Sequence, residues 1–279
     1  MTDRAAHDTA MPATPAAEPP AAEPTPPQAK KPNNWVGVGL VGVFLGFAGW
    51  ILAAPTGLAV FGFVLTGWVL SVMAHEFAHA AVAYAAGDWT VKPKGYLSFD
   101  PRRYGDLGVS LVIPLVALAL GGIGFPGGAV YLQTQMMRNR AWRSAASLAG
   151  PAATFVVLVV IALGTRVWLN LGVTGAGGYA LVSALTLLGF LQATALVLNL
   201  LPVPGLDGFN AIRPWLPGRW TAHLRKLEGL TMVAMLLVIF YVPGASQRLF
   251  DTAIAIAARL GLEPAILRIG WRLFHFWQS

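Results

Sequence analysis

From residue 35 onward, the chain alternates long apolar runs with shorter polar connections. A helix that crosses the hydrocarbon core of a bilayer needs about 20 apolar residues. The first, second, fourth and fifth runs meet that length, and flanking residues can complete the sixth. The pattern therefore predicts an all-α polytopic membrane protein with about five transmembrane helices. The six runs cover 35–54, 57–86, 109–125, 147–169, 179–201 and 229–243.

The third run, 109–125, differs from the others. Pro114 interrupts it, and three glycines lie near its end. We interpret it as a re-entrant segment, which enters the membrane and leaves on the same side. Irregular backbone at membrane depth is tolerated where it lines a water-filled cavity.

Lysine and arginine residues gather on one side of the membrane if 109–125 is re-entrant. Cytoplasmic loops carry the excess of Lys and Arg in membrane proteins. The pattern predicts a multi-pass protein of the cell membrane, with its N-terminus on the cytoplasmic side. The Ala- and Gly-rich composition suits a bacterial inner membrane. The tail, 87–146 and 202–228 hold 3, 7 and 4 Lys or Arg, and the opposite loops 55–56 and 170–178 hold none.

The two ends of the chain differ from its apolar middle. Residues 1–34 contain eight prolines and few large apolar residues, which is typical of a disordered tail. Residues 244–279 mix arginines with Leu, Ile, Phe and Trp, which predicts an amphipathic segment at the membrane interface. Residues 35–243 form the membrane-embedded domain. Within it, 90–100 alternates partly like an edge strand, and is equally typical of an interfacial loop anchored by aromatic residues.

Composition supports the membrane assignment and restricts the chemistry. The chain is 56% hydrophobic and 11% charged, whereas soluble domains have about 25% charged residues. It has no cysteine, which excludes disulfides and thiolate metal ligands. The net charge of +7 fits basic cytoplasmic loops, and no basic patch interleaved with aromatic residues indicates nucleic-acid binding.

The second apolar run contains the motif HEFAH, from His75 to His79. Residues i and i+4 lie on one face of a helix, so both imidazoles can reach a single metal ion. Glu76 adjoins the first ligand and can take a proton from a water at the metal. Ionisable groups inside a membrane need polar partners, and one zinc ion with its water serves all three. The motif therefore predicts a zinc site.

A catalytic zinc commonly has three protein ligands, and the third must come from elsewhere in the chain. Asp207 stands out because it follows the fifth apolar run, within NLLPVPGLDGFNAIRP at 199–214. Taken alone, the prolines and glycines around it favour an ordinary helix terminator and turn over a ligand-bearing segment. If Asp207 reaches the metal, the second and fifth runs must end on the same side. That requirement again makes 109–125 re-entrant.

HEFAH on a membrane helix, followed by NLLPVPGLDG at 199–208, resembles the site-2 protease family of intramembrane zinc metalloproteases. The resemblance implies that Asp207 is the third zinc ligand. It also implies that Asn199 is a polar residue near the active site, where it is a candidate for orienting the substrate or the oxyanion. Membrane-associated strands, such as one at 90–100, are a further expectation from the family.

A third motif adds to the resemblance. AGPAAT, residues 149–154, is similar to the family's Gly-Pro motif, although many members carry Asn where this chain has Thr154. The likeness covers roughly residues 57–215.

These features predict an intramembrane zinc endopeptidase that hydrolyses peptide bonds of membrane-spanning substrates, with Glu76 as general base. The implied partners are the lipid bilayer and a transmembrane protein or peptide. One alternative is a pseudoprotease that binds transmembrane helices without cutting, but a binder has no need for Glu76. The other is a metal or ion transporter, which would show several intramembrane carboxylates and often an internal repeat. The sequence leaves the substrate and the oligomeric state open.

Overall fold

A computed structural model describes residues 34–104, 130–172, 175–218, 224 and 228–278. The described chain is helical and contains no strand. Its α-helices are α1 (Trp35–Ala53), α2 (Gly57–Ala86), α4 (Arg140–Asn170), α5 (Ala176–Asn199), α6 (Asp207–Ile212), α8 (Glu228–Tyr241), α9 (Ala245–Arg259) and α10 (Pro264–Phe274). Short 3-10 helices lie at Trp89–Val91, Pro101–Arg103, Thr134–Met136, Arg213–Trp215 and Phe276–Gln278.

Four of these helices, α1, α2, α4 and α5, are long and apolar enough to cross a membrane. A fifth span is obtained if α8 and α9, which are long and apolar enough only together and are bent by 89° where they meet, count as one. The prediction of an all-α polytopic protein with about five transmembrane helices is confirmed. The tail predicted at 1–34, except for Asn34, and the re-entrant segment predicted at 109–125 lie outside the described residues.

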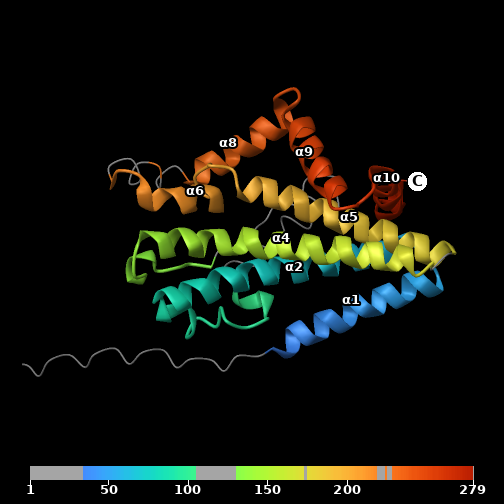
Figure 1. The fold of residues 1–279 in the computed structure, drawn as a ribbon, viewed down its shortest axis with the longest axis horizontal. Coiled ribbons are helices and arrows are strands. Elements are labelled where there is room, and N and C mark those ends of the chain that lie inside the picture. The colour runs from blue at the N-terminus through green and yellow to red at the C-terminus, as the bar shows by residue number, and fades with distance from the viewer. Residues whose placement is uncertain (1–33, 105–129, 173–174, 219–223, 225–227, 279) are drawn as a thin grey trace, which may run out of the picture.

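The long helices form a bundle in which α1 and α4 run in one direction and α2 and α5 in the other (Figure 1). The helix α2 packs against α1, α4 and α5. The backbone N–H of Arg138 donates to the carbonyl of Ala86 at 3.0 Å, so the chain approaches α4 at the end where α2 stops. Consequently α2 and α5 end at the same end of the bundle (Figure 1), which is the arrangement expected if Asp207, beyond the end of α5, is to reach His75 and His79.

Small residues allow the helices of the bundle to approach closely. A Cβ atom added at Gly67 of α2 would lie 2.6 Å from the Leu188 side chain of α5. Such contacts are the usual way in which membrane helices pack, because lipid tails are as apolar as leucine and a hydrophobic drive is missing. On α1, by contrast, Val41 and Leu45 are exposed, as side chains that face lipid would be.

The C-terminal helices pack onto the bundle. Both α9 and α10 contact α5, and α10 also contacts α2. A Cβ added at Gly270 would lie 2.2 Å from the backbone oxygen of Ser183, and one at Gly57 would lie 2.2 Å from Phe276. These contacts place the C-terminal helix at the end of the bundle where α2 and α5 begin, opposite to α6 (Figure 1).

Segment 90–100 does not form the strand that was one of its two expected conformations. Trp89–Val91 is a 3-10 helix, and turns follow. Asp88 explains the difference, because its Oδ1 atom accepts hydrogen bonds from the backbone N–H and the hydroxyl of Thr90 at 3.1 and 2.6 Å. Local side-chain bonds of this kind compete with extended structure. The loop interpretation holds, but Tyr96 is buried and so is not an exposed anchor.

Candidate metal centre

HEFAH forms one turn in the C-terminal half of α2. All three ionisable side chains are buried, with 7% of His75, 3% of Glu76 and 5% of His79 exposed. The Nε2 atoms of the two histidines lie 3.0 Å apart. Asp207, the first residue of α6, brings Oδ2 to 3.2 Å from Nε2 of His75 and Oδ1 to 3.3 Å from Nε2 of His79. The structure thus brings together the three residues expected to hold zinc.

The turn after α5 positions Asp207. Gly205 has a φ of +101°, a conformation that side chains with a Cβ rarely adopt. A Cβ at Gly208 would lie 2.3 Å from the Leu200 oxygen, so glycine is needed where the chain folds back onto the end of α5. The hydroxyl of Ser144 donates to the carbonyl of Ala211 at 2.6 Å. This bond fastens α6 to α4, so the Pro- and Gly-rich segment does more than end a helix.

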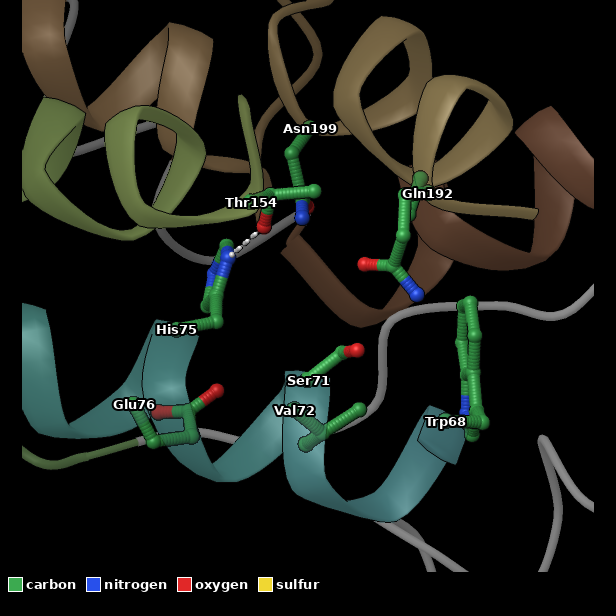
Figure 2. Close-up of a pocket in the computed structure, with 9 residues that line it drawn as sticks. Trp68, Ser71, Val72, His75, Glu76, Thr154, Gln192 and Asn199 are labelled. Atoms are coloured by element: carbon green, nitrogen blue, oxygen red, sulfur yellow. Dashed lines mark hydrogen bonds between the residues drawn. The ribbon is translucent and has the colours of Figure 1, made fainter. Parts of the chain in front are cut away.

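A second layer of contacts orients the two imidazoles. Nδ1 of His79 donates to the carbonyl of Ala146 at 2.7 Å. Nδ1 of His75 lies 2.9 Å from Oγ1 of Thr154, as the dashed line in Figure 2 marks. Because a carbonyl oxygen only accepts, Nδ1 of His79 carries the proton and its Nε2 is free to ligate. Partners of this type fix the tautomer and ring orientation of metal-binding histidines.

Gly150 of α4 lies against the ligands. A Cβ at this position would be 2.2 Å from Nε2 of His79 and 2.5 Å from Nε2 of His75. Ala146, Gly150 and Thr154 are spaced by four residues, so one face of α4 supplies both histidine partners and the space between them. The Gly-Pro motif was recognised in the sequence, but no role was assigned to Gly150 or Ala146. Their spacing marks one face of a helix, but only the packing of α4 against α2 shows that this face meets the two histidines.

The donor set and its spacing fit a zinc ion. Tetrahedral zinc with bonds of about 2.0–2.2 Å would hold its ligand atoms about 3.3–3.6 Å apart. Here the two Nε2 atoms lie 3.0 Å apart, and the nearest Asp207 oxygen is Oδ2 at 3.2 Å for His75 and Oδ1 at 3.3 Å for His79. Two imidazoles and one carboxylate are also typical of catalytic zinc. Within the described part of the chain, His75, His79 and Asp207 are the group whose ligand atoms converge this closely.

Electrostatics favour an ionised Asp207. Burial raises the pKa of its carboxyl, but the adjacent imidazoles of His79 and His75 outweigh burial and hold that pKa below its usual range. The carboxylate is therefore in the form that binds metal.

Glu76 and Asn199 lie beside this cluster. Oε2 of Glu76 accepts a hydrogen bond from the backbone N–H of Val130 at 3.2 Å. Both residues line a small cavity of about 20 Å³ between α2, α4 and α5 (Figure 2). Asn199 is the last residue of α5 and is 5% exposed. The structure thus places the candidate base and the candidate orienting amide on one cavity that His75 also borders.

Comparison with known proteins agrees with this geometry. No protein-family profile and no solved structure match the chain. It is 40% identical over 224 residues to the protein named "Putative zinc metalloprotease Rip2" of Mycolicibacterium smegmatis. The aligned region covers 80% of this chain and 83% of the relative. A protein of the same name from Mycobacterium tuberculosis is 38% identical over 218 residues, or 78% and 82% of the two chains.

A more distant relative shares the activity in its name. The "Putative zinc metalloprotease YwhC" of Bacillus subtilis is 26% identical over 197 residues, which is 69% of this chain and 86% of the relative. Motifs, fold and relatives agree on a zinc-dependent hydrolase of peptide bonds, and they do not favour a pseudoprotease or a transporter. The chain belongs to the site-2 protease family of intramembrane zinc metalloproteases.

Proposed function

We propose that this zinc metalloprotease cleaves membrane-spanning proteins or peptides at a site reached from the cytoplasm. The observation that carries the proposal is the convergence of His75, His79 and Asp207, with Glu76 beside them, inside a bundle of membrane-length helices. Glu76 lies ten residues before the end of α2, which is a depth of about 15 Å along the helix axis. A peptide bond hydrolysed there would lie within the membrane segment of a substrate.

His75, His79 and Asp207 are assigned as the zinc ligands. Bound zinc would supply a Lewis acid that polarises the scissile carbonyl and lowers the pKa of a water molecule to about 7. Thr154 and the Ala146 carbonyl keep both imidazoles turned so that their Nε2 atoms face Asp207.

Glu76 is assigned as the general base. Its carboxylate takes a proton from the attacking water and later delivers it to the leaving amine. The hydrogen bond from the Val130 N–H holds one carboxylate oxygen in place. Asn199 is assigned to orient the substrate or stabilise the oxyanion, because an amide N–H that faces the site is the kind of donor such an oxygen needs.

The proposed location is the cell membrane, with the N-terminus and the mouth of the active site in the cytoplasm. The clustering of Lys and Arg in the N-terminal tail, 87–146 and 202–228 supports this orientation. Water and substrate would reach the metal at the end of the bundle where α2 and α5 stop. The non-helical residues 201–206 lie at that end, where backbone beside a watery opening can be hydrated.

The test uses purified protein reconstituted into liposomes with a reporter that has one transmembrane segment. Zinc content is measured in the wild type and in Glu76→Gln, and the cut position is found by mass spectrometry. We expect both proteins to retain zinc and only the wild type to cut, within the membrane segment of the reporter. Cleavage that persists in Glu76→Gln would refute the role of Glu76. A cut confined to the soluble part of the reporter would refute the proposed substrate class.

A further inference from the structure

Three buried hydrogen-bond donors line the cavity beside Glu76 and lack an acceptor among the described residues. They are Nε1 of Trp68, Nε2 of Gln192 and Nδ2 of Asn199. The three residues are 1%, 2% and 5% exposed. Buried donors are almost always paired, and an unpaired donor inside a membrane bundle is costly. This group of donors therefore needs an occupant that accepts hydrogen bonds.

The donors lie on two facing helix stripes. Trp68, Ser71 and Glu76 follow one face of α2, while Gln192 and Asn199 are seven residues apart on α5 and so face the same way. In Figure 2 the Gln192 amide and the Ser71 hydroxyl point into the space between the helices, near Trp68. The stripe on α2 begins at Glu76 and continues through Ser71 to Trp68, away from the end of the bundle that holds α6. The two stripes thus place polar side chains in a region where burying apolar side chains would cost less free energy.

The size of the cavity identifies the occupant. A water molecule needs about 10–15 Å³ of accessible volume together with two to four polar partners. The cavity offers about 20 Å³, which admits one water and no peptide segment. A water that accepts from Gln192 and Trp68 has two protons left to donate. Glu76, Ser71 and Thr154 supply acceptor oxygens on the same cavity.

We propose that Trp68 and Gln192 hold an ordered water on the membrane side of Glu76, as a waiting position for the water that hydrolysis consumes. This inference rests on the proposed function, since each peptide bond cut uses one water molecule. The metal centre is buried among apolar helices. A water already held in the cavity next to Glu76 could therefore replace the consumed water by moving a short distance, without a new water having to enter from solvent. Asn199 borders the same cavity at its metal end and connects the waiting water with the reaction site.

The test compares Gln192→Met with Thr194→Val. Methionine keeps the length of the side chain and removes the donors. Thr194 is a matched control, because it lies on the same helix, is buried, and bonds, among the described residues, the Phe190 carbonyl of that helix. We expect Gln192→Met to lower kcat about tenfold at unchanged KM and full zinc content, and Thr194→Val to match the wild type. Trp68→Phe serves as the second variant if Gln192→Met does not fold.

A direct readout does not depend on activity. A high-resolution structure of the zinc-loaded wild type should show density for one water within hydrogen-bond distance of Gln192 and Trp68, and Gln192→Met should lack it. A cavity without that density overturns the proposal. A raised KM with unchanged kcat also overturns it, because the donors would then bind backbone carbonyls of the substrate. Because the water is observed without turnover, failure of the proposed function would show separately, as a wild type that binds no zinc or cuts no reporter.

Discussion

Replacement of Gly150 by alanine is predicted to weaken zinc binding while leaving the fold intact. The new Cβ would lie 2.2 Å and 2.5 Å from the two Nε2 atoms that face Asp207, whereas carbon and nitrogen atoms in contact are more than 3 Å apart. Either α4 moves away from α2 or the imidazoles rotate. Rotation would break the bond of His79 to Ala146 or of His75 to Thr154.

The magnitude follows from two opposing effects. Overpacking by one methyl group costs about 1–3 kcal/mol, which corresponds to a loss of roughly 5- to 150-fold in zinc affinity if all of it falls on the bound state. Alanine in place of glycine within a helix gains up to about 1 kcal/mol. The metal-free variant should therefore unfold at a temperature close to that of the metal-free wild type, even though its zinc site is damaged.

The assay is zinc affinity by chelator competition, together with thermal unfolding of the metal-free protein and cleavage of the reporter. Gly164→Ala is the matched control, since Gly164 lies on the same helix and a Cβ there would meet no atom of the described residues within 4 Å. The control should bind zinc and cut like the wild type. Zinc affinity of Gly150→Ala within threefold of the wild type would refute the reasoning.

Three further predictions concern a hydrogen-bond partner of His75 and two buried carboxylates in the segment after α2. Thr154→Val removes the partner of Nδ1 of His75 and should weaken zinc binding 10- to 100-fold, measured by chelator competition, whereas Thr154→Asn should restore most of it. Asp88→Ala leaves three donors without their acceptor, so denaturant unfolding should show a loss of about 1–3 kcal/mol at unchanged zinc content. Hydrogen bonds from Arg102 lower the pKa of the Asp100 carboxyl, so the stability it gives is full above pH about 4 and lost as pH falls further. Asp100→Asn should flatten that part of the pH profile in thermal unfolding, and an unchanged profile would contradict the assignment.

The sequence predicted most of the scaffold because membrane helices leave long apolar runs. The expected runs 57–86 and 179–201 became Gly57–Ala86 and Ala176–Asn199. HEFAH was equally readable, since the spacing of two histidines on one helix is a local property. The role of Asp207 was harder to predict, because its contact with α2 depends on a reversal of the chain. The prolines and glycines around it are also compatible with an ordinary turn. The family resemblance, rather than spacing, favoured it as a ligand.

Other parts of the site have no sequence signature that can be recognised in isolation. The partner of His79 is a backbone carbonyl, which every residue possesses, so Ala146 was invisible. Gly150 matters because of what lies opposite it, and the pairing of α4 with α2 is a tertiary property. The same holds for the C-terminal helices. An amphipathic pattern shows that one face is apolar, but it does not say whether lipid or α5 covers that face.

The origin of the ligands in two distant helices has a consequence for how the protein is made. His75 and His79 are synthesised with α2, and Asp207 follows 132 residues after His75. At about 5–20 residues per second, a ribosome needs roughly 7 to 26 seconds to reach it. Throughout that interval the nascent chain has two of the three proposed ligands and no complete metal site. Each new copy therefore has a complete candidate site only after α2, α4, α5 and α6 have assembled, so that its proteolytic competence begins with the finished bundle.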